Sequence, residues 1–137
     1  MAKKIDELPV YIKACEFAVA VSAILEKPGL RKDHQHRKQI SEALDSMQAN
    51  MEEGFEQGTD RAFANYLTNA KGSVGELIGH LKRARRKDYI TVAEEKLLVS
   101  QAEELGRMLG GFIKYLRNCD WKDRGRHGYD ATDGKRA

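Results

Sequence analysis

The chain has 137 residues, of which 33% are charged and 41% hydrophobic, and its net charge is only +3. This length fits one domain with a single substantial core, and so small a net charge favours no class of partner by itself. The two cysteines, Cys15 and Cys119, lie far apart and form no C-x-x-C motif, which is typical of reduced thiols in a cytoplasmic protein.

The N-terminal segment resembles a basic stretch followed by an apolar one. Asp6, Glu7, Lys13 and Glu16 interrupt it, however, and such charges argue against a signal peptide or a membrane-spanning helix. We therefore expect no membrane association and a cytoplasmic location.

The first predicted helix covers about 8–26, with Pro9 in its first turn. It carries two apolar stripes, whereas one stripe is enough for an intramolecular core. The second stripe predicts a helix that is buried on two sides, and hence a subunit interface. The stripes are Leu8, Tyr11, Cys15, Ala18, Ser22 and Leu25, and Val10, Ala14, Phe17, Val21 and Ile24.

Two further helices are predicted at about 33–57 and 60–87, after a break at "EKPGLRKD". Asp33 and Thr59 are suitable N-caps for them. The later helix has the alternating three-and-four spacing of left-handed helix packing. The apolar positions are Ile40, Leu44, Met47 and Met51, and then Phe63, Leu67, Ala70, Val74, Leu77, Leu81 and Ala84.

A fourth helix is predicted at about 91–118, opened by a capping box from Thr91 to Glu94. Its core stripe is Leu98, Ala102, Leu105, Leu109, Phe112 and Leu116. Residues 119–137 are poor in aliphatic side chains and are expected to be a mobile tail. Residues 1–118 are therefore expected to form one all-α domain, an up-down-up-down four-helix bundle with short links.

The last two predicted helices contain interior glycines, among them Gly72, Gly75, Gly106 and Gly110. Each costs about 1 kcal/mol relative to alanine, so a compensating close approach between helix backbones is the usual reason. The alternative is that these glycines have no structural role and arose by neutral drift.

Two polar stripes carry carboxylates, Glu53 and Glu76, that could form an acid/base pair only if they lay close together. Glu53 and Glu76 are separated by about 20 Å if the hairpin turns near Gly58, because a helix rises about 1.5 Å per residue. They therefore cannot act on one substrate atom within a subunit. His34, His36 and His80 come near one another by the same reasoning, but satisfied or exposed histidines are favoured over a metal site. We expect no catalytic residue, no metal and no cofactor.

Charge is segregated between the two ends of the expected bundle. The segments "RKDHQHRK" (31–38) and "KRARRK" (82–87) share one end, whereas no basic residue occurs between Gln39 and Asp60. Basic residues at a helix N-terminus oppose the helix dipole, so those of the first segment require another reason. Binding to a phosphate backbone or to an acidic protein surface would explain these basic residues. The alternative is a solvated basic end that binds no ligand. The expected nucleic-acid-binding residues are Arg31, Lys32, Arg37, Lys38, Lys82, Arg83, Arg85, Arg86 and Lys87.

Several motifs resemble those of a known family. They are Asn50-x-x-Glu53-Gly54-Phe55, Phe63, Leu67, "AKGSVGEL" (70–77) and "EELGRMLGGFI" (103–113). Together, over about 8–117, they are similar to the bacterial four-helix-bundle proteins encoded in intervening sequences of 23S rRNA genes. The last motif also resembles the accessory variability protein of diversity-generating retroelements.

The resemblance implies a ring-like homopentamer without catalytic activity. It also implies a structural role for Asn50, Glu53, Gly54, Gly72, Glu76, Gly106 and Arg107. Combined with the basic end, it predicts an interaction protein that binds RNA or a nucleoprotein. The alternative is an accessory adaptor for the reverse transcriptase of a diversity-generating retroelement.

Overall fold

The computed structural model describes residues 2–119, 129–130 and 135–136. A short 3₁₀ helix, Ile5–Glu7, precedes the helices α1 (Pro9–Ile24), α2 (Pro28–Lys32), α3 (His34–Glu56), α4 (Asp60–Arg86) and α5 (Val92–Asn118). Two-residue strands, β1 (Tyr129–Asp130) and β2 (Lys135–Arg136), pair antiparallel. The prediction of an all-α fold is thus confirmed for the body of the protein, and each long helix begins and ends within two residues of its predicted bounds.

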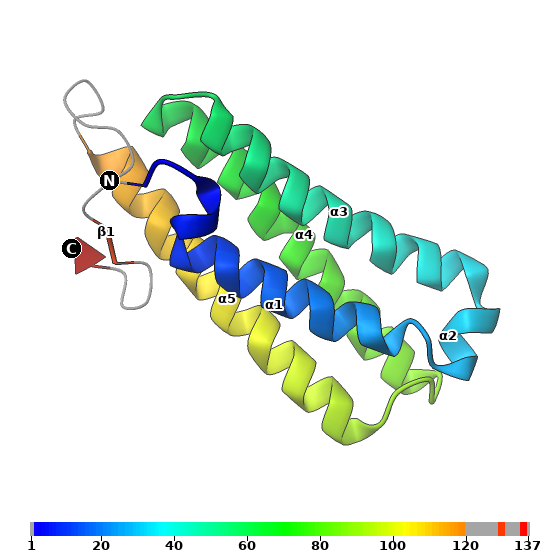
Figure 1. The fold of residues 1–137 in the computed structure, drawn as a ribbon. Coiled ribbons are helices and arrows are strands. Elements are labelled where there is room, and N and C mark those ends of the chain that lie inside the picture. The colour runs from blue at the N-terminus through cyan, green and yellow to red at the C-terminus, as the bar shows by residue number, and fades with distance from the viewer. Residues whose placement is uncertain (1, 120–128, 131–134, 137) are drawn as a thin grey trace.

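Four long helices lie side by side, with α2 at one end of the group (Figure 1). The start of α3 contacts the segment just after α4, because Lys87 Nζ lies 3.1 Å from Asp33 Oδ2. Farther along the same pair, Ser73 Oγ donates to Ser46 Oγ at 2.9 Å. The α3–α4 pair is therefore antiparallel, which brings segments that are distant in sequence to one end.

Side-chain caps define where the long helices begin. Asp33 accepts from the backbone N–H of His36, Thr59 accepts from Ala62, and Thr91 forms a full capping box with Glu94. All three predicted caps are confirmed. They satisfy backbone donors that have no partner within the helix itself.

The core follows the predicted stripes of α3, α4 and α5, since every apolar position named for these helices is buried. For α1, the stripe that includes Val10 and Phe17 is buried, whereas the other stripe is divided. Its residues Tyr11 and Cys15 are half-buried and contact Glu52 and Gln48 of α3. Part of the second stripe is therefore covered within the chain, and it is no proof of a subunit interface.

The segment "EKPGLRKD" was predicted as a break, but it contains the five-residue helix α2. Pro28 occupies its first turn, where a missing N–H costs nothing. Leu30 is fully buried, and the ring of Tyr89 packs so closely on Gly29 that an added Cβ would lie 2.3 Å from it. Tertiary packing thus stabilises a helix too short to be stable alone.

The predicted close approach at interior glycines is wrong for most of them within the chain. A Cβ at Gly72, Gly75 or Gly106 would meet nothing within 4 Å. Gly54 is different, because a Cβ there would lie 2.6 Å from the Cβ of Tyr66 on α4. Gly54, which was not among these predicted positions, therefore sits where two helices cross closely.

The prediction of a mobile tail at 119–137 falls mostly on residues outside the described part of the chain. Within that part, Cys119 is buried and caps α5. None of the helices between residues 2 and 119 is long and apolar enough to cross a membrane.

Candidate nucleic-acid interface

The predicted basic residues come together at one end of the molecule. They belong to α2, to the first turns of α3, and to the last turns of α4 with the residue after it. Figure 1 shows α2 beside the link between α4 and α5. This end, which we call the basic end, comprises Arg31, Lys32, Arg37, Lys38, Lys82, Arg83, Arg85, Arg86 and Lys87.

Asp33 connects three segments at the basic end. Its Oδ2 accepts a hydrogen bond from the Tyr89 hydroxyl at 2.8 Å and lies 3.1 Å from Lys87 Nζ, while Oδ1 accepts from the backbone of His36 at 3.1 Å. These hydrogen bonds, that of Tyr89 first, lower the pKa of Asp33 to about 2. Asp33 therefore stays ionised and neutralises part of the local positive charge.

Two buried histidines lie between α3 and α4 just beneath this surface. The rings of His36 and His80 have centroids 5.8 Å apart, and His36 Nε2 lies 3.1 Å from the backbone oxygen of His80. Since an oxygen can only accept, His36 carries its proton on Nε2. Its Nδ1 then accepts from Lys87, at 3.4 Å.

His80 Nδ1 is 2.7 Å from a guanidinium nitrogen of Arg83, which can only donate. His80 is therefore an acceptor at Nδ1. Burial is the main cause that lowers the pKa of both imidazoles, and for His80 the charge of Arg83 adds to it. Both histidines are thus held in the neutral form by their surroundings.

The basic residues divide into two groups by their partners. Arg37 pairs with Glu26 at 2.9 Å and also donates to the Leu25 carbonyl, while Arg85 lies 3.8 Å from Glu95. Lys87 and Arg83 have the partners described above. Over residues 2–119, no ion pair or hydrogen bond engages the side chains of the exposed residues Arg31, Lys32, Lys38, Lys82 and Arg86.

Most of the predicted structural group lies on α3 and α4, whereas Gly106 and Arg107 belong to α5. Asn50 Nδ2 donates to the backbone oxygen of Ser46 at 2.8 Å, and its Oδ1 accepts from Asn69 at 3.4 Å. With the Ser73–Ser46 contact, these bonds form a polar seam along the two helices. The seam satisfies its own groups, as expected for a structural joint.

Glu53 and Glu76 are not brought together. Glu53 is exposed and accepts from Gln57 one turn later, at 3.1 Å. Glu76 instead lines a cavity of about 340 Å³ with Gln39, Glu42 and His80. The two carboxylates line no common pocket among those found in the described part of the chain.

The three predicted histidines differ in their surroundings. His34 is exposed, whereas His36 and His80 are buried and hydrogen-bonded. No group of three or more His, Cys, Asp or Glu side chains suited to a metal ion occurs among the described residues.

The sequence did not predict that Asp33, besides capping α3, accepts hydrogen bonds from Tyr89 and Lys87. The available signal was the position of Tyr89 shortly after the basic run of α4, in a link that must return past the start of α3. Sequence reasoning also missed Glu26 and Glu95, which neutralise two of the predicted ligands. Both stand at helix ends that meet only in the folded chain.

Comparisons with known proteins were made over the whole chain. Neither the search of curated proteins nor the search of solved structures found a match. The model of one protein family matches residues 6–111, which include all the long helices except the end of α5. The chain therefore belongs to the 23S rRNA-intervening sequence protein family.

Proposed function

We propose that this protein is a non-catalytic cytoplasmic interaction protein whose basic end binds the phosphate backbone of RNA or of a nucleoprotein. In this proposal the chain is an up-down-up-down four-helix bundle that assembles into a ring-like homopentamer. A ring would present several basic ends on one face, and weak contacts made together give high avidity.

The observation that carries the proposal is the set of exposed cations without partners. Arg31, Lys32, Lys38, Lys82 and Arg86 gather at one end of the described structure, and none of them forms an ion pair with a carboxylate of the described residues. Like charges brought together repel, and a polyanion would relieve that repulsion while releasing its counterions. The remaining basic residues already have partners, so we expect a smaller role for them in binding.

Assembly is supported by apolar side chains and open helix surfaces. Val19 on α1 and Leu97 on α5 are 72% and 60% exposed. Gly106 leaves the backbone of α5 uncovered, where a second helix could approach closely. A neighbouring subunit would cover these surfaces.

The test is binding of a fluorescently labelled RNA to the full chain over a range of salt concentrations. We expect affinity to fall steeply as salt rises, because bound cations are released from the RNA. The double variant Lys82→Ala/Arg86→Ala should weaken binding for every RNA sequence and reduce the slope of the log–log salt plot by about 1 per lost phosphate contact.

The matched control is Lys3→Ala/Lys4→Ala, which removes the same charge from exposed residues outside the basic end. It should bind RNA like the unmodified protein. Binding that does not depend on salt, no binding at low salt, or an equal loss in both double variants would each reject the proposal.

A further inference from the structure

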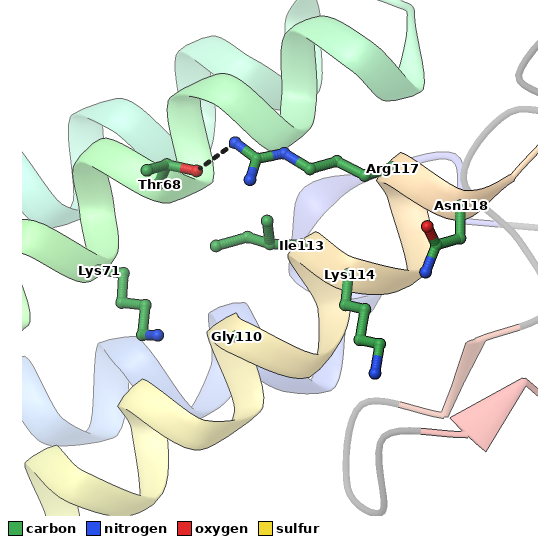
Figure 2. A pocket seen from close by; sticks show the side chains of 7 residues that line it. All are labelled: Thr68, Lys71, Gly110, Ile113, Lys114, Arg117 and Asn118. Atoms are coloured by element: carbon green, nitrogen blue, oxygen red, sulfur yellow. Dashed lines mark hydrogen bonds between the residues drawn. The ribbon is translucent and has the colours of Figure 1, made fainter.

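A second cationic site lies between α4 and α5. The pocket has a volume of about 450 Å³ and includes Lys71 of α4 and Lys114 and Arg117 of α5. Figure 2 shows that its side chains come from both helices and that Arg117 reaches across toward α4. Besides these cations, the lining residues are Thr68, Gly110, Ile113 and Asn118.

Arg117 is anchored by a hydrogen bond, and Lys71 lies close to α5. Arg117 donates to the hydroxyl of Thr68 at 3.0 Å, and that hydroxyl donates in turn to the carbonyl of Ala64 at 2.9 Å. Lys71 extends over the bare backbone of Gly110, since a Cβ there would lie 3.3 Å from its Nζ. Figure 2 shows the Arg117 guanidinium beside Thr68 and the Lys71 side chain directed toward Gly110.

The charge in this pocket is not balanced by the described residues. No acidic side chain lines it, and Lys71, Lys114 and Arg117 take part in none of the ion pairs found between residues 2 and 119. The helix dipole accounts for Lys114 and Arg117 near the C-terminus of α5. It does not account for Lys71, which lies in the middle of α4 and faces the same space.

The groove continues toward the link between α3 and α4. A neighbouring pocket of about 360 Å³ is lined by Arg61, Asn65, Leu116 and the same Arg117. Arg117 therefore stands between two cavities, and Arg61 adds a fourth positive charge along the groove. A ligand larger than a simple ion has room here.

We propose that this pocket binds a phosphate group. The arginine fork of Arg117 and the ammonium group of Lys71, with the further positive charge of Lys114, suit a doubly charged anion better than a singly charged carboxylate. The phosphate belongs either to a small phosphomonoester or to a nucleic-acid backbone. The site is distinct from the basic end and requires none of its residues.

The test is an NMR titration of the full, isotope-labelled chain with inorganic phosphate at constant ionic strength. We expect saturable shifts of the backbone amides of Gly110, Lys114 and Arg117, and no such shifts with acetate or chloride. Arg117→Gln and Lys71→Gln should each weaken phosphate binding at least tenfold. Gly110→Leu keeps all the charges but fills the pocket, and it should abolish binding while circular dichroism shows an intact helical fold.

Arg107→Gln is the matched control, because Arg107 is exposed on the same helix and does not line the pocket. It should bind phosphate normally, as should Lys82→Ala/Arg86→Ala, so this proposal and the proposed function can fail separately. Equal shifts with chloride, or a loss in Arg107→Gln as large as in Arg117→Gln, would overturn the phosphate site. A short RNA that competes with phosphate at these amides identifies a nucleic-acid source, and phosphate binding without competition identifies a phosphomonoester.

Discussion

At the scale of single residues, the basic end depends on groups that are held in one charge state. Asp33 stays ionised through its hydrogen bonds to Tyr89, His36 and Lys87. His36 and His80 stay neutral because burial disfavours their charged form, and the nearby charges of Lys87 and Arg83 oppose protonation further. The hydrogen bond to the His80 backbone and the charge of Asp33 act on the pKa of His36 in the opposite direction. The exposed cations of the basic end therefore lie above two buried, neutral histidines.

We predict that the protein loses stability as the pH falls below neutrality. The pKa of each buried imidazole lies below its ordinary value of 6.5, so the unfolded chain binds more protons than the folded one in the window just below pH 6.5. The free energy of unfolding, measured by urea denaturation, should therefore be lower at pH 5.5 than at pH 7.5. The double variant His36→Gln/His80→Gln should reduce this pH dependence.

His34→Gln is the control for the pH dependence, since His34 is exposed. It should keep the pH dependence of the unmodified protein. A dependence that persists undiminished in His36→Gln/His80→Gln would show that other groups cause it.

At the scale of elements, the contact between α3 and α4 fixes the geometry of the basic end. Gly54 lies where the end of α3 meets the first turns of α4, against Tyr66 and Phe63. Farther along, the polar seam from Asn50 to Ser73 and the His36–His80 contact hold the same two helices. A change in their spacing at one end would therefore be transmitted toward the basic end.

We predict that Gly54→Ala destabilises the protein by about 1–3 kcal/mol, the usual cost of overpacking. The new Cβ would lie 2.6 Å from the Cβ of Tyr66, and neither atom can move without its backbone. Gly72→Ala is the matched change, because nothing lies within 4 Å of a Cβ at that position. It should stabilise α4 by up to about 1 kcal/mol, the difference in helix propensity.

Urea denaturation of the two variants measures both effects. Equal stability of Gly54→Ala and the unmodified protein would mean that α3 and α4 do not approach closely at this point.

At the scale of the whole molecule, the chain leaves apolar surface uncovered. Ile12 and Val19 on α1, and Val92 and Leu97 on α5, are each at least 46% exposed. Single exposed apolar residues are normal, but the outer face of α1 also borders a largely apolar hollow that includes Tyr11 and Cys15. This surface is our candidate for the contact between subunits.

We predict that Val19→Glu/Leu97→Glu converts the assembled protein into monomers. Two carboxylates would have to be buried without partners if the contact formed, and burial of unpaired charge is strongly unfavourable. Light scattering coupled to size-exclusion chromatography measures the change, with circular dichroism to verify that the helices remain. Gln35→Glu, an exposed position on α3, should leave the assembly intact.

A monomeric unmodified protein would reject the proposed ring. An assembly that survives Val19→Glu/Leu97→Glu would place the subunit contact on another surface.

Much of the fold could be predicted because its signals are local. The caps Asp33, Thr59 and Thr91 bond backbone groups three residues away, and the core stripes follow from helical periodicity. The gathering of the basic segments followed as well, because short links force neighbouring helices to run antiparallel. Helix α2 escaped prediction because its stability comes from burial of its own Leu30 and from Tyr89, which a distant part of the chain brings against Gly29.

The sequence by itself therefore determined the helices, their caps, their buried faces and the end where the basic segments meet. Only the tertiary structure decided which cations are paired, where the glycines face, and that Lys71, Lys114 and Arg117 share a pocket. The physical reason is the range of the interactions. Capping and periodicity act within one helix, whereas ion pairing and pocket formation depend on how two helices are rotated and spaced against each other.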